Sequence, residues 1–110
     1  MKAVNLTPHP LHILGEDGKL LLEVKPSGTV ARIAPRRTRQ EALEIGGTQV
    51  PVFSVSALDI EGLPEPREDA IYVVSSYVEG QTTRPDVFAP GRLVRDDGGN
   101  VIGCVGLKQR

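Results

Sequence analysis

Hydrophobic positions in this chain fall into short runs that glycine and proline interrupt, a pattern typical of strands. The segments that read as strands are 2–6, 11–14, 20–24, 29–34, 50–56, 70–74, 93–95 and 101–107. Residues 70–74 form an unbroken apolar run, so they are predicted to be the central strand. Helical spacing is confined to two short stretches, a helix at 75–82 and a helical turn at 41–45.

Two turns rich in glycine and acidic residues predict hairpins. Gly15-Glu-Asp-Gly18 would join two strands into a hairpin over 11–24, and Asp96–Asn100 would do the same over 93–107. The proline-containing stretches 59–69 and 84–91 read as loops. The expected fold is mainly β (or α+β): an antiparallel sheet or small barrel with one or two short helices.

Length and composition fit one globular domain spanning residues 1–110. The chain is 39% hydrophobic and 25% charged, which is typical of folded proteins. Its net charge of −1 attracts neither nucleic acid nor an anionic membrane. Only four aromatic side chains are present, too few for a base-stacking platform, so nucleic acid is an unlikely partner.

Cysteine usage and the N-terminus point to a reducing compartment. Cys104 is the single cysteine, and its apolar surroundings predict a buried, reduced thiol rather than a nucleophile. Neither a signal-peptide pattern nor a run of apolar residues long enough for a membrane helix is found, which predicts a cytoplasmic protein with no membrane partner.

The most unusual local stretch is Asn5-Leu-Thr-Pro-His9. If the first strand continues, alternation puts Asn5, Thr7 and His9 on one face. These side chains could hydrogen-bond a ligand, or they could satisfy the turn that the two prolines impose. Residues 9 and 12 form an HxxH pair, but Pro10 between them directs the two rings to opposite faces, so no metal site and no cofactor are expected.

Charged side chains supply the rest of the candidate site. Arg32 lies inside an alternating run, so it is expected to be half-buried and to need an anionic partner. Arg84 and Asp86 flank Pro85 and could form an ion pair or line a pocket rim. The ligand-binding hypothesis joins these groups in one pocket made by Asn5, Thr7, His9 and Arg32, with Arg84 and Asp86 at its rim. The alternative pairs Arg32 with Asp86.

Several motifs together resemble a family of small proteins found in phages, prophages and some actinobacterial genomes. The matching segments are Asn-Leu-Thr-Pro-His (5–9), Pro-Ser-Gly-Thr-Val-Ala-Arg (26–32), Glu-Gly-Leu-Pro-Glu-Pro (61–66), Tyr-Val-Val-Ser (72–75), Arg-Pro-Asp-Val (84–87) and Pro-Gly-Arg-Leu-Val-Arg-Asp (90–96). The resemblance spans nearly the whole chain and assigns no catalytic residue. It implies phage-linked biology in a host cytoplasm, which favours small proteins that bind host metabolites or host factors.

These observations favour a non-catalytic protein that binds a small anionic, nucleotide-like molecule. One alternative is a structural or interaction protein, such as a virion accessory or an inhibitor of a host protein. Another is a hydrolase or lyase with His9 as base, although Ser75-Ser76 lacks the nucleophile-elbow motif. Exposed strand edges near Pro51 and in the terminal hairpin also predict a homodimer.

Overall fold

A computed structural model describes residues 1–110, apart from the side chains of residues 56–58. Strands dominate it, and its helix is a single turn, α1 (Ser76–Glu79). The strands are β1 (Lys2–Asn5), β2 (Leu11–Leu14), β3 (Leu20–Val24), β4 (Arg32–Arg39), β5 (Leu43–Ile45), β6 (Thr48–Val50), β7 (Phe53–Glu61), β8 (Ala70–Val73), β9 (Val87–Arg95) and β10 (Val101–Lys108). The predicted class, mainly β with one short helix, is confirmed.

Six strands form one sheet in the order β1-β8-β9-β10-β2-β3. The hairpins β2–β3 and β9–β10 are antiparallel, as their turns predict. The pairs β1–β8, β8–β9 and β10–β2 are parallel, because long connections rather than tight turns join these strands. The chain beyond β3 returns to the first strand through a bridge between Asn5 and Pro26, so the sheet nearly closes into a small barrel.

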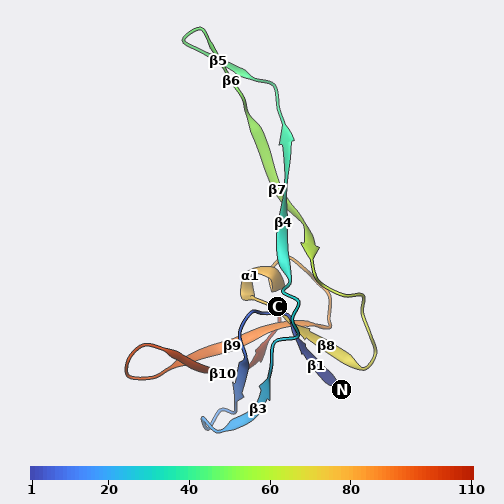
Figure 1. Cartoon of the computed structure of the whole chain (residues 1–110), viewed down its shortest axis with the longest axis vertical. Helices are drawn as coiled ribbons and strands as arrows, with labels where there is room; N and C mark the ends of the chain where they lie inside the picture. Colours follow the sequence, from blue (N-terminus) through green and yellow to red (C-terminus); the bar gives the residue numbers. More distant parts are fainter.

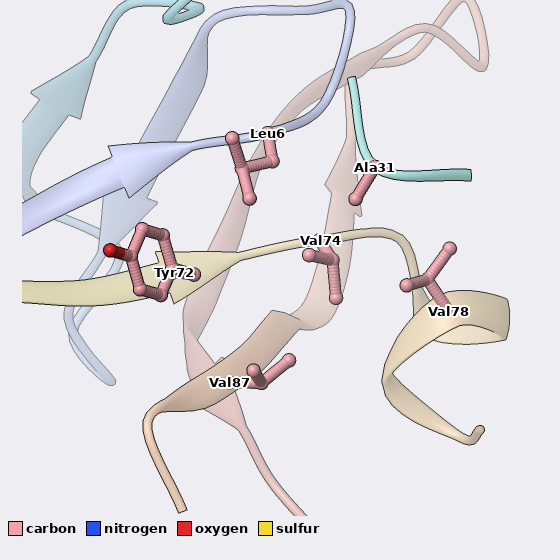
Figure 2. Packing of buried hydrophobic residues seen from close by; sticks show 6 residues of the cluster. All are labelled: Leu6, Ala31, Tyr72, Val74, Val78 and Val87. Atoms are coloured by element: carbon pink, nitrogen blue, oxygen red, sulfur yellow. The ribbon is translucent and has the colours of Figure 1, made fainter. Parts of the chain in front are cut away.

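Strand β8 separates two hydrophobic clusters because its side chains alternate between faces. Val73 packs on one side with Leu11, Ile13 and Cys104. The other side holds the larger cluster, which Figure 2 shows. Its side chains come from β8 and the residue after it, from β9 and α1, and from the segments that follow β1 and precede β4: Leu6, Ala31, Tyr72, Val74, Val78 and Val87. The prediction of a strand at 70–74 is confirmed over residues 70–73, but this strand is not the central one, because β8 lies next to the end strand β1 and the middle of the sheet is β9 and β10.

A long β-ribbon projects from this body, as Figure 1 shows. We call residues 32–61 the arm: β4 pairs with β7 along its length, and the β5–β6 hairpin forms its tip. The radius of gyration is 18.9 Å, whereas a compact chain of this length would have about 13 Å. The arm accounts for this difference, because it extends the molecule to 64 Å along its longest axis.

The arm differs from the sequence predictions in several ways. Residues 41–45 are not a helical turn, because Gly46 and Gly47 have φ angles of 58° and 83° and make a tight hairpin turn. The predicted strand 29–34 begins only at Arg32 and runs on to Arg39. The predicted strand 50–56 is interrupted at Pro51, as the missing backbone donor suggests.

Two predicted loops are shorter than expected. Strand β7 continues to Glu61, into the predicted loop 59–69. The predicted loop 84–91 ends at Val87, where strand β9 begins. The terminal hairpin is not an edge either, because β9 and β10 lie between β8 and β2. The end strands of this sheet are β1 and β3, and the two-stranded ladders of the arm have outer edges of their own.

We expect the body to fold without most of the arm. Every described member of the two hydrophobic clusters lies outside residues 35–58, and Ala34 and Asp59 are register partners. Replacing residues 35–58 with Asn-Gly should change the free energy of unfolding by no more than about 1 kcal/mol. Urea denaturation followed by circular dichroism measures this change, and a loss above about 2 kcal/mol would show that the arm stabilises the core.

Candidate functional site

The side chain of Asn5 is buried at the end of β1, with 1% of its surface exposed. Its Nδ2 donates hydrogen bonds to the carbonyl oxygens of His9, at 2.7 Å, and Val24, at 3.1 Å. Its Oδ1 accepts from the backbone N–H of Thr7 at 2.9 Å and from the Thr7 hydroxyl at 2.6 Å. All of this amide's hydrogen-bonding capacity is used within the fold. Asn5 therefore ties the end of β1 to the turn that follows it and to the end of β3, a junction that we call the seam of the barrel.

Arg32, the first residue of β4, lies on the surface. Its neighbour Ala31 is buried and donates its N–H to the carbonyl of Leu6. The expectation of a half-buried Arg32 is wrong, because the ladder begins at this residue and alternation from Val30 does not apply. Its register partner across the arm is Glu61, and Asp86 pairs with Arg84 instead.

Arg84 and Asp86 form a two-pronged ion pair, with Nε–Oδ1 at 3.0 Å and Nη2–Oδ2 at 2.7 Å. Arg84 also donates to the carbonyl of Pro64 at 2.9 Å, and its guanidinium lies 5.8 Å from the ring centroid of Tyr72. The hydrogen bond from Arg84 holds the pKa of Asp86 below its usual range, and the same bond raises the pKa of Arg84. This pair fastens the loop after β7 to the core.

A cleft of about 900 Å³ lies in the body. The turn after β1, the start of β2, the β9–β10 hairpin and the junction of β8 with α1 surround it. Its lining comprises Thr7, Pro8, His9, Pro10, Leu11, His12, Ser75, Ser76, Pro90, Gly91, Arg92, Leu93, Val101, Ile102, Gly103, Cys104 and Lys108. Two members of the predicted site, Thr7 and His9, therefore face this cleft.

Two glycines allow the backbone to approach closely beneath the cleft. A side chain at Gly91 would collide with the carbonyl oxygen of Val105, and a Cβ at Gly103 would lie 2.8 Å from that of His12. The strands β9, β10 and β2 can pack together only because these positions lack side chains.

The cleft combines apolar walls with positive charge. Leucine, valine, isoleucine and proline side chains supply most of its surface, and Arg92 and Lys108 supply two cations. None of its described lining residues is acidic. His12 Nε2 lies 2.8 Å from Glu23 Oε2, so the ring is held by an anchor outside the lining. Such a hollow suits a molecule with an apolar body and an anionic group.

Two possible nucleophiles in the cleft have structural tasks. Burial raises the pKa of the Cys104 thiol, so it stays protonated and unreactive, and the prediction that this residue is buried is confirmed. Ser75 caps α1, because its hydroxyl accepts the N–H of Val78 at 3.3 Å.

The six predicted site residues are thus divided among different places. Thr7 and His9 line the cleft, and Asn5 lies behind them in the seam. Arg84, which pairs with Asp86, lines a separate hollow of about 440 Å³, and Arg32 belongs to the arm. The cations that do line the cleft, Arg92 and Lys108, were missed; the signal for Arg92 was its place beside Gly91, a position where only glycine fits.

A search of protein-family profiles, curated proteins and solved structures finds no match to this chain. Within the described residues, no helix has the length and apolar character needed to cross a membrane.

Changing Asn5 to aspartate tests the seam. Asn5→Asp keeps the acceptor but removes both donors and sets a carboxylate against the carbonyls of His9 and Val24. We expect a loss of about 3 kcal/mol in the free energy of unfolding, because a charge replaces a buried neutral amide and two part-buried carbonyls lose its donors. The chain's other asparagine, Asn100, is exposed, so Asn100→Asp is the matched control. Equal effects in urea titrations of the two variants would contradict the role of Asn5.

Two arginine–aspartate pairs with the same spacing test the loop clasp. Arg84→Met should lower the free energy of unfolding by about 2 kcal/mol, because it leaves the largely buried Asp86 without its partner. Arg67→Met should lower it by less than about 0.5 kcal/mol, because the pair of Arg67 with Asp69 is exposed. The lowered pKa of Asp86 means that its contribution is present above the ordinary carboxyl pKa of about 4 and is lost as the pH falls through the folded-state value.

The difference between wild type and Arg84→Met should therefore shrink at acidic pH. Thermal unfolding across the acidic range measures it. A difference that stays constant down to the lowest pH would show that Arg84 acts through packing on Tyr72 alone.

Proposed function

We propose that this chain is a non-catalytic protein that captures a small anionic, nucleotide-like ligand in the cleft bordered by the turn after β1, the β9–β10 hairpin and the start of α1. The observation that carries the proposal is the cleft itself: about 900 Å³, with apolar walls, two cations and no acid among its described lining residues. Pockets for small molecules typically have this size and this mixture of apolar walls and few polar groups.

The division of labour within the cleft follows from residue chemistry. Leu11, Leu93 and Ile102 offer an apolar surface for a flat ring system such as a nucleobase. Arg92 and Lys108 would neutralise a phosphate or carboxylate, and a guanidinium can donate two parallel hydrogen bonds to such a group. Thr7 and His9 would hydrogen-bond the neutral polar atoms of the ligand.

A binding protein fits the cleft better than a hydrolase or lyase does. Ser75 is used to cap α1, and the Cys104 thiol is held protonated. His9 has no acidic neighbour among the described lining residues to orient its ring for proton transfer. The resemblance to phage and prophage proteins adds to the proposal that the captured molecule is a metabolite of the host cytoplasm.

Calorimetric titration with AMP tests this function, and adenosine serves as the uncharged match. We expect AMP to bind at least about tenfold more tightly than adenosine, because only AMP carries a group for the two cations. Arg92→Gln/Lys108→Gln should weaken AMP binding by at least about tenfold.

Arg95→Gln/Lys25→Gln is the control, because it removes the same charge from exposed positions outside the cleft. Failure of AMP to bind, or equal affinity for AMP and adenosine, would overturn the proposed ligand class. Equal weakening by both double variants would mean that net charge, rather than the cleft, attracts the anion.

A further inference from the structure

We propose that the arms of two copies of this chain lie side by side, antiparallel, about a two-fold axis near Gln40, and so form a homodimer. The inference is independent of the ligand cleft, because every described residue that lines the cleft lies outside the arm.

Large hydrophobic side chains lie exposed along the arm, far from both clusters of the body. Phe53 and Val55 of β7 are 47% and 58% exposed, and Leu43 and Ile45 of β5 are 56% and 58% exposed. A two-stranded ribbon has only marginal stability in water when nothing covers it. The arm therefore needs a covering partner that presents apolar surface of its own.

The two ladders of the arm also leave outer strand edges unpaired. Within the described sheets, β4 pairs with β7 alone and β5 with β6 alone. Soluble proteins shield such edges with charge, proline or a partner. Here arginines occupy β4 and Pro51 interrupts the returning strand. These features disfavour pairing with an arbitrary strand and favour a partner of complementary charge.

Charge order along the outgoing side of the arm, from β4 to β5, identifies the partner as a second copy. Arg37 and Arg39 come first, and Glu41 and Glu44 follow toward the tip. The ion pair of the arm joins Arg36 to Asp59 at its base, and Arg37 lies 5.6 Å from the ring centroid of Phe53. Within the described residues, Arg39, Glu41 and Glu44 take part in no ion pair.

A two-fold axis near Gln40 makes this order self-complementary. Reversing this side of the arm about that point sets Arg39 level with Glu41 of the second copy and Arg37 level with its Leu43, next to Glu44. At about 3.4 Å per residue, each of these groups is within about 14 Å of the axis, so the basic half of one arm faces the acidic half of the other. In such a symmetric interface every contact occurs twice, so the Arg39–Glu41 ion pair forms twice.

The same reversal joins the apolar side chains. Val55 is the register partner of Arg37, and Leu43 lies next to Glu44, so the middle of one arm meets the tip of the other. Burial of these side chains supplies the affinity, because exposed ion pairs are individually weak. The charges set the direction and register of pairing.

Charge reversal in the full-length chain tests the pairing. In the acidic-arm variant, Arg37→Glu/Arg39→Glu, and in the basic-arm variant, Glu41→Arg/Glu44→Arg, the centre of each arm carries charge of one sign. We expect wild type to be a dimer by sedimentation equilibrium and each variant to dimerise at least about tenfold more weakly. An equimolar mixture of the two variants should restore the dimer, because their arms are complementary.

Lys2→Glu/Lys25→Glu changes the net charge as the acidic-arm variant does, but on exposed positions of the body, and should remain a dimer. Circular dichroism confirms that each variant is folded. A monomeric wild type, variants that dimerise like wild type, or a mixture that stays monomeric would each overturn the proposal. Dimers that persist in both variants would place the interface elsewhere, with the exposed leucines of β3 as the next surface to change.

Discussion

Closure of the barrel depends on one buried amide. The Asn5 side chain joins the end of β1 to the carbonyl of Val24 at the end of β3 and to that of His9 in the following turn. The six-stranded sheet has β1 and β3 at its two ends, so this group ties together the two strands that would otherwise be open edges. No apolar side chain of this size could satisfy the carbonyls that meet there.

The same amide shapes the wall of the cleft. By fixing Thr7 and the carbonyl of His9, it sets the path of the turn whose residues 7–10 line the hollow. The residues that would contact a ligand then come from this turn and from the hairpin opposite it. The same turn thus contains a polar group that stabilises the fold and residues that line the pocket. This is why the sequence signal at Asn5-Leu-Thr-Pro-His9 could be interpreted either as a ligand site or as a stabilised turn.

Local chemistry made the body of the fold predictable from sequence. The hairpins 11–24 and 93–107 and a strand at 70–74 were predicted correctly, because turn glycines and unbroken apolar runs act over a few residues. The central place expected for that strand was wrong, because sheet order depends on long-range pairing. The arm was not, because its strands lack the alternation that a buried face imposes. Arg92 and Lys108 were missed since only the assembled sheet brings them to the cleft that His9 also lines, and strand pairing over such long distances in sequence leaves no local signature.

The arm also affects how the barrel closes during folding. Lys2 pairs with Ala70, so the first ladder of the sheet joins distant parts of the chain, and the whole arm lies between them. An arm that zips up early as a local hairpin removes roughly half of the intervening chain from the loop that must close, which lowers the entropic cost by about 0.6 kcal/mol. A segment that contributes to the hydrophobic core only at its base, through Ile33 and Ile60, would in this way shorten the search for the core's own strand partners.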